Sequence, residues 1–245
     1  MDAITEYALY VESGPRRRKT MVHVLELLGC IAQGATTEEA LQGTPGAIRA
    51  YLCFLKRHGE AVEPEAAIST TIAVHVMEGS WIGQGDPAAG FPPDFEALRA
   101  GDLAVYLRRL DWLWSDLLET VQGLSRQQLV ARPEDGGRSL DAILKHVAGA
   151  HGAYLRYLVG KVDGLPAALR AVEEADPESV PLALALAHLG HACVARLEAL
   201  TEAERSRSVP HGQLTWTARR ALRRMLEHAW EHLSEISRRL EKAGG

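Results

Sequence analysis

The hydrophobic positions of this chain repeat with a short period near the amino end and with a helical period over the rest. Apolar and β-branched residues alternate or run at strand length in ITEYALYVE (4–12) and TMVHVLELLGCIAQG (20–34), on either side of the turn-like segment SGPRRRK (13–19). Two such runs joined by a short polar turn predict a β-hairpin. STTIAVHVMEG (69–79) has the same character and predicts a third strand.

A helical segment lies between the hairpin and the third strand. Thr36 and Glu39 have the spacing of a capping box, which predicts the start of a helix. Thr44-Pro45-Gly46 is expected to interrupt it, because Pro45 suits the first turn of a fresh helix. AIRAYLCFLKRH (47–58) then continues at helical spacing. The predicted order of this part is β-β-α-β.

The remainder of the chain is predicted to be helical. SWIGQGDPAAGFPPD (80–94) is rich in glycine and proline without periodicity, which is typical of a linker. Four amphipathic segments follow, and four helices of this length favour a four-helix bundle. They span residues 96–123, 139–160, 178–204 and 217–242. We therefore expect an α+β chain with a small α/β domain over 1–85, a linker over 86–95 and a bundle over 96–245.

The charge of the chain argues against nucleic acid and membrane partners. The net charge is −5, which gives no general attraction to polyanions or to anionic lipid. Residues 1–95 hold 7 Lys and Arg against 12 Asp and Glu, whereas residues 96–245 hold 20 of each, so a basic partner would favour the first part. The 3 cysteines follow no CxxC spacing, and no apolar run has the length of a membrane span. These features predict a cytoplasmic protein.

The last predicted helix carries two histidines where an apolar core is expected. In RRMLEHAWEHLSEI (223–236), His228 and His232 are four residues apart. Four residues turn a helix by about 400°, so the two rings point within about 40° of one another and could share one ion. The alternative is that each imidazole lies at the edge of the core and is satisfied by an ordinary hydrogen bond.

A third histidine strengthens the metal interpretation. In SLDAILKHVAGAHGAYLRYL (139–158), Ser139 is a candidate N-cap and His146 lies beside the predicted inward stripe. Small residues at 148–150 would let another helix approach. Bundles build metal sites from inward side chains on facing helices. Three imidazole nitrogens would leave coordination positions open, as in catalytic rather than structural sites.

Other polar and aromatic side chains have weaker functional interpretations. His151 lies about 140° around the helix from His146, so the two rings cannot easily bind the same ion. It is a weak candidate for a general base or for a residue that supports a metal ligand without binding the metal. His188 and His191 form a rival pair beside Cys193. The ordinary expectations are a solvated helix face for Glu227, outward sheet faces for His23 and His75, a surface loop for His211, and core or dimer contacts for Trp112, Trp114 and Trp230.

Two segments of the first part follow the pattern of a known family. They are LLGCIAQGATTEEAL (27–41) and AIRAYLCFLKRHGEAVEP (47–64). With them, residues 4–85 resemble the HicB family of antitoxin-like domains. The resemblance implies a protein partner, such as a basic RNA-cleaving toxin of HicA type. In that interpretation the bundle would serve as a dimerising scaffold.

Two segments of the second part carry a different resemblance. RSLDAILKHVAGAHGAYL (138–155) and LTWTARRALRRMLEHAWEHLSEI (214–236) are similar to the DinB family of four-helix proteins, over about residues 96–243. The resemblance implies a divalent metal of the zinc, nickel or manganese class on His146, His228 and His232. It also implies hydrolase or thiol S-transferase chemistry on a small electrophilic substrate, with a low-molecular-weight thiol as a possible cosubstrate, in a homodimer.

Overall fold

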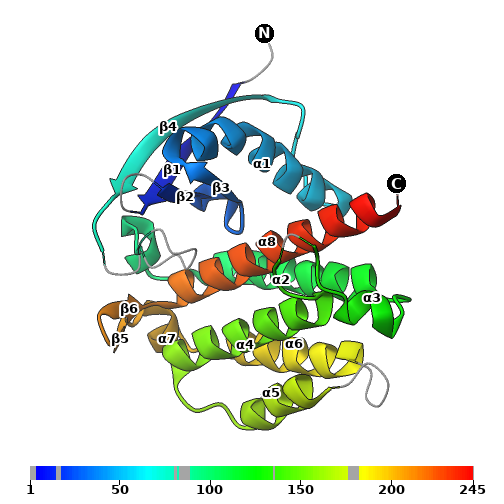
Figure 1. The fold of residues 1–245 in the computed structure, drawn as a ribbon. Coiled ribbons are helices and arrows are strands. Elements are labelled where there is room, and N and C mark those ends of the chain that lie inside the picture. Colours follow the sequence, from blue (N-terminus) through cyan, green and yellow to red (C-terminus); the bar gives the residue numbers. More distant parts are fainter. Residues whose placement is uncertain are drawn as a thin grey trace. The chain divides into compact units, whose positions relative to one another are not determined.

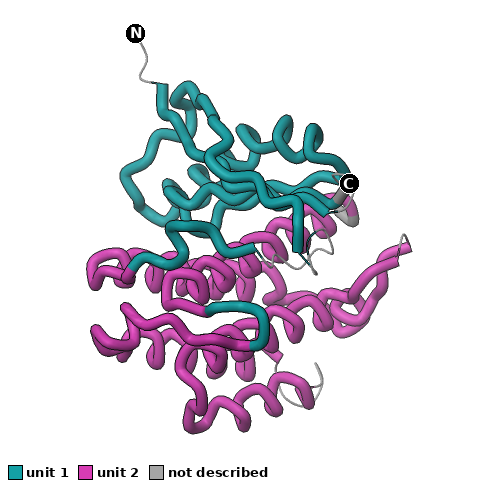
Figure 2. The backbone as a smooth tube through the Cα atoms, turned by 90° about the vertical axis from the view of Figure 1, so that its left-hand side faces the viewer, with its two compact units in different colours: residues 1–96, 212–215 teal, residues 97–211, 216–245 magenta. Residues whose placement is uncertain are grey.

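The computed structural model divides the chain into two compact units (Figure 1, Figure 2). Unit 1 holds residues 1–96 and 212–215, and unit 2 holds residues 97–211 and 216–245. Unit 1 is a mixed sheet with helices and unit 2 is mainly helical, which confirms the α+β class. The residues that the structure describes are 4–14, 18–79, 82, 89–134, 136–175 and 182–244.

Unit 1 is built on a four-stranded sheet in the order β3-β2-β1-β4. β1 pairs antiparallel with β2 and parallel with β4, and β2 pairs antiparallel with β3. The sequence predicts one continuous strand over residues 20–34, but the structure contains two strands there. A 3-10 turn at Leu25–Leu27, followed by Gly29 with φ of 110°, reverses the chain between them. The strands are β1 (Ile4–Ser13), β2 (Arg18–Val24), β3 (Ile31–Thr36) and β4 (Ala67–Val76).

Helix α1 (Thr37–Arg57) runs without a break between β3 and β4. Thr36 caps it, since its hydroxyl oxygen accepts the backbone N–H of Glu39 at 3.1 Å. The expected interruption at Pro45 is wrong. Proline removes a single backbone hydrogen bond of the helix, and the hydroxyl of Thr44 donates to the carbonyl of Ala40 at 2.8 Å in the same turn.

Residues 89–95, expected to lie in a linker, belong to unit 1, while residues 86–88 lie outside the described residues. Phe91 is fully buried, and its ring lies 5.2 Å from the ring of His23. The carboxylate of Glu12 accepts the backbone N–H of Ala89 at 3.0 Å and lies 3.1 Å from His23 Nε2. The expectation that His23 faces outward is therefore wrong, because this segment covers it. The segment ends in a 3-10 turn, Pro92–Phe95.

Gly34 provides a test of how closely β3 approaches α1. A Cβ at this position would lie 2.4 Å from the backbone nitrogen of Ala40, which cannot move without shifting the helix. We expect Gly34→Ala to lower the free energy of unfolding by about 2 kcal/mol or more. Gly46→Ala is the matched control, because its Cβ would meet nothing within 4 Å and alanine stabilises a helix interior by about 1 kcal/mol relative to glycine. Urea unfolding followed by circular dichroism measures both; equal stability of the two variants would contradict this packing.

Unit 2 contains the four long helices that the sequence predicts, and they form the four-helix bundle. Within the bundle, α2 and α4 each pack on both α6 and α8. Among the described residues, none of the helices combines the length and the apolar character required to cross a membrane. The elements after residue 99 are α2 (Ala100–Val121), α3 (Arg126–Val130), α4 (Leu140–Val159), α5 (Leu165–Glu174), α6 (Leu182–Glu198), α7 (Glu202–Ser206), β5 (Val209–His211), β6 (Leu214–Trp216) and α8 (Ala218–Gly244). Leu214 and Thr215 of β6 belong to unit 1.

Short helices interrupt the segments that join the bundle helices. The third predicted helix, 178–204, is α6 followed by a separate α7, which starts at the capping box of Thr201 and Glu204; residues 178–181 lie outside the described residues. The close approaches also differ from expectation. A Cβ at Gly149 would meet nothing within 4 Å, whereas one at Gly152 would lie 2.9 Å from Leu169 of α5.

Candidate metal centre

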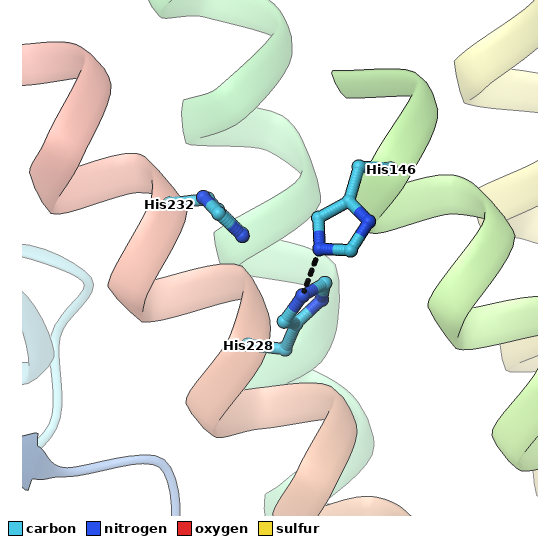
Figure 3. A group of neighbouring side chains, drawn as sticks. All are labelled: His146, His228 and His232. Carbon is cyan, nitrogen blue, oxygen red and sulfur yellow. Dashed lines mark hydrogen bonds between the residues drawn. The ribbon is translucent and has the colours of Figure 1, made fainter. Parts of the chain in front are cut away.

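Three histidines meet between helices α4 and α8 (Figure 3). His146 comes from α4, and His228 and His232 come from successive turns of α8. One nitrogen of each ring lies within 4.8 Å of the others. Among the described residues, no other group of three or more His, Cys, Asp or Glu side chains gathers in this way. The sequence-predicted residues are therefore brought together by the fold.

The apolar faces of the two helices place these rings. On α8, Met225, Ala229 and Ile236 are fully buried, and the histidines lie on the same side of the helix. His228 and His232 are only 6% and 7% exposed. His146 is partly exposed, at the edge of the buried stripe of α4. The site is thus enclosed on the α8 side and accessible at His146.

The donor atoms suit a divalent metal ion. His146 Nε2 and His228 Nε2 lie 3.1 Å apart (Figure 3). Two nitrogens bound to one tetrahedral ion at about 2.0–2.1 Å would be separated by about 3.3 Å, close to this spacing. Burial, together with the neighbouring His232 and Arg224, holds the pKa of His228 well below its ordinary value. A neutral imidazole keeps the lone pair that a metal ligand requires.

Glu235 fixes the orientation of His232. Its carboxylate lies 2.9 Å from His232 Nδ1 and accepts that N–H, which leaves Nε2 as the lone-pair nitrogen. This hydrogen bond is the main reason why the pKa of Glu235 is lowered. Arg239 pairs with the other carboxylate oxygen and donates to the carbonyl of Arg138 at 2.6 Å. Sequence reasoning missed Glu235, although a carboxylate three residues after a ligand on a helix is a usable signal.

Removal of this carboxylate should weaken metal binding without removing a ligand. We expect Glu235→Ala to lower the affinity for zinc by about 10–100-fold, the usual cost of losing a hydrogen-bond partner of a metal-bound histidine. Glu241→Ala, at an exposed position of the same helix, is the control. Competition with a chromophoric chelator gives both affinities. Unchanged affinity in the Glu235 variant would show that its bond to His232 has no bearing on the site.

The other candidate histidines do not belong to the cluster of three, although the ring centroid of His151 lies 6.2 Å from that of His228. His151 is completely buried, and its Nε2 lies 3.0 Å from the carbonyl oxygen of Met225. Burial lowers the pKa of His151 to about 3, so it is neutral near pH 7. His188 and His191 are exposed on α6, and Cys193 is buried, which raises the pKa of its thiol to about 12. This thiol is therefore a core side chain.

The sequence predicts that Glu227 lies on a solvated helix face, and this prediction is wrong because the side chain is buried. It is 1% exposed and accepts hydrogen bonds from Arg223 and Arg224, each at 3.1 Å. Spacings of three and four residues on α8 bring these partners together. Arg224 also donates to the hydroxyl of Tyr154 at 3.1 Å.

The remaining candidates occupy ordinary positions. Trp114 is a core residue, whereas Trp112 and Trp230 are half-buried, and their role in a dimer stays a prediction. His211 lies in the short strand β5, is exposed, and packs on the ring of Tyr157 at 4.1 Å.

Comparisons with known proteins cover both parts of the chain. The family model of the DinB superfamily matches residues 109–236. A UPF0150 protein of Thermoplasma acidophilum is 42% identical over 52 residues, which are 21% of this chain and 75% of that protein. Among solved structures, YfiT from Bacillus subtilis, described as a probable metal-dependent hydrolase with an unusual four-helix bundle topology, is similar with a TM-score of 0.46 and 22% identity, over 63% of this chain and 96% of that chain.

The family-model match and the UPF0150 match agree with the two resemblances seen in the sequence. The DinB match spans more than half of the chain and includes all three histidines. The UPF0150 match falls in the amino-terminal region, where the HicB-like segments lie. The chain therefore belongs to the DinB superfamily through its helical bundle, which is fused to an amino-terminal HicB-like domain of the UPF0150 family.

Proposed function

We propose that the helical unit is a metal-dependent enzyme, a hydrolase or thiol S-transferase that acts on a small electrophilic substrate. The observation that carries the proposal is the convergence of His146, His228 and His232 within 4.8 Å. Imidazole rings buried side by side in an apolar core destabilise the folded protein unless their lone pairs interact with a partner. One divalent ion would satisfy all three.

The donor set indicates the class of metal and the class of chemistry. Imidazole nitrogens suit zinc, nickel and other late first-row ions, and three protein ligands leave positions for exchangeable groups. When bound, such an ion supplies Lewis acidity, which lowers the pKa of a water or thiol toward neutrality and polarises a carbonyl. The same Lewis acidity would activate either nucleophile, so the proposal includes both water and a low-molecular-weight thiol.

Side chains around the histidine cluster would determine how a substrate reaches it and what charge the substrate meets there. His146 is partly exposed and marks the side from which a substrate reaches the ligands. Tyr154 lies edge-on to His228, with ring centroids 6.4 Å apart, and the guanidinium of Arg224 lies 5.5 Å from the centroid of the Tyr154 ring. Glu227 partly balances the charge of Arg224. The remaining positive field would stabilise negative charge that develops on a substrate oxygen or sulfur.

Activity of the full-length chain after metal removal and reconstitution tests the proposal. Protein stripped with a chelator is reloaded with zinc, nickel or manganese, and metal content is measured as ions per chain. Each form is then assayed with an activated ester and with a small thiol plus an alkylating fluorogenic electrophile. We expect about one ion per chain and a rate that requires both the ion and His228. Failure of every metal to bind well above trace occupancy would overturn the proposal.

A second candidate function concerns unit 1, which would bind a basic protein. Acidic residues outnumber basic ones in residues 1–95, 12 against 7. β4 forms one edge of the sheet, and Ile72 on this strand is 45% exposed. An exposed edge strand can accept a further strand from a partner. A small basic toxin of HicA type is the partner that the HicB-like relationship favours.

Calorimetry with a small basic toxin of HicA type tests this second function. We expect binding that weakens as salt is raised, because the acidic charge of unit 1 contributes to it. Ile72→Lys should weaken the complex, since it places a positive charge on the edge strand that would face the basic partner. His228→Ala should bind as the wild type does, since it alters only the other unit. Equal binding by the Ile72 variant would exclude β4 as the contact.

A further inference from the structure

Three buried ring nitrogens near the histidine cluster lack a hydrogen-bond partner within the described part of the chain. They are His228 Nδ1, His151 Nδ1 and Trp114 Nε1. All three side chains are buried, at 6%, 0% and 4% exposure. A buried polar atom left without a hydrogen-bond partner destabilises the folded protein, so three such atoms in one region call for a common explanation.

The hydrogen on each nitrogen follows from what the rest of the ring contacts. His151 Nε2 faces the carbonyl oxygen of Met225 at 3.0 Å, so Nε2 carries the hydrogen and Nδ1 is an acceptor. His228 directs Nε2 toward His146, and a metal ion there would use that lone pair, so Nδ1 carries the hydrogen. The indole nitrogen of Trp114 is always a donor. The region thus offers two donors and one acceptor.

The spacing of the rings excludes a direct bond between the two imidazoles. Their centroids are 6.2 Å apart. Because an imidazole nitrogen lies about 1.2 Å from its ring centre, a nitrogen of one ring could approach a nitrogen of the other no closer than about 3.8 Å, which is too far for a hydrogen bond. If the two Nδ1 atoms face one another, their separation is one that a single water molecule can bridge. The ring of Trp114 meets that of His151 edge-on, with centroids 5.2 Å apart.

We propose that this region binds one ordered water molecule, which accepts the N–H groups of His228 and Trp114 and donates to His151 Nδ1. Two donors and one acceptor are the partners of a typical buried water. His151 would then be a positioning residue that acts through the water to hold His228 as a metal ligand. The inference rests on the proposed metal-binding function. His151 and the water would thus orient His228, as the carboxylate of Glu235 orients His232.

Zinc affinity of three full-length variants tests the role of His151. His151→Leu, which removes the acceptor, should lower the affinity by about 10-fold or more. His151→Gln should restore much of it, because an amide offers both a donor for Met225 and an acceptor for the water. His191→Leu, which removes an exposed histidine from α6, should have no effect. Thermal unfolding of each variant shows that it is folded at the temperature of the titration.

The structural prediction is tested on the zinc-loaded wild type. A high-resolution crystal structure should contain a water within about 3.2 Å of both Nδ1 atoms, and ¹⁵N spectra of labelled histidine should show His151 with its hydrogen on Nε2. A dry region, the opposite tautomer, or a folded His151→Leu variant with wild-type affinity would overturn the inference, as would a Gln variant as weak as Leu. If the wild type binds neither zinc, nickel nor manganese, the proposed function fails as well; if zinc binds normally, only the water and the role of His151 are rejected.

Discussion

His228→Ala is expected to lower the affinity of the protein for zinc by about 100-fold or more, because it removes one of three nitrogen ligands and opens the buried side of the site. His146→Ala and His232→Ala should have effects of similar size, since each ring offers one nitrogen to the same cluster. The measurements are chelator competition and the metal-to-protein ratio after desalting.

The control for this series is His191→Ala, which removes an exposed imidazole of the same chain. It should retain about one ion per chain. A result in which all three cluster variants keep their ion would place the metal elsewhere. A result in which a single variant loses it would indicate that the other two rings are held by hydrogen bonds alone.

Metal-free protein should lose stability steeply as the pH falls below 6.5. Burial depresses the pKa of His151 from 6.5 to about 3, and that of His228 is also depressed. Below pH 6.5 the unfolded chain therefore binds more protons than the folded chain, so the free energy of unfolding decreases as pH decreases. Each such group contributes up to about 1.4 kcal/mol per pH unit across this window.

Urea unfolding at several pH values between 7 and 5, followed by tryptophan fluorescence, measures this effect in unit 2. Four of the 5 tryptophans, at 112, 114, 216 and 230, belong to that unit. His151→Gln cannot be protonated, so its stability should fall less steeply, by about 1 kcal/mol per pH unit at the lower end of the range. Parallel slopes for this variant and the wild type would mean that His151 is hydrated and titrates normally. The depressed pKa of Glu235 enters only below its ordinary value of 4.5, outside this range.

The bundle and the histidine cluster could be predicted because both follow from helical periodicity. His228 and His232 share one face of α8, and His146 borders the buried stripe of α4. Packing of α4 on α8 then leaves little choice about where the rings meet. Local spacing was enough for these residues.

Burial of polar residues could not be predicted in the same way, because distant parts of the chain determine it. His23 alternates with apolar neighbours like an outward sheet residue, yet Phe91, far along the sequence, covers it. Glu227 has the spacing of a surface ion pair but is buried together with its arginines. Pro45 is compatible with a continuous helix because the surrounding turns of α1 pack on the sheet, which propensity alone does not reveal.

The positions of the ligands along the sequence connect metal uptake to chain folding. His146 and His228 are 82 residues apart. An ion held by both would act as a cross-link that closes a long loop of the chain. Because the ion would bind the folded chain more tightly than the unfolded chain, it would raise the free energy of unfolding by the difference between these two binding free energies. Coordination by all three rings would be complete only after α8 has docked against α4, so full loading would be a late event in the maturation of the protein.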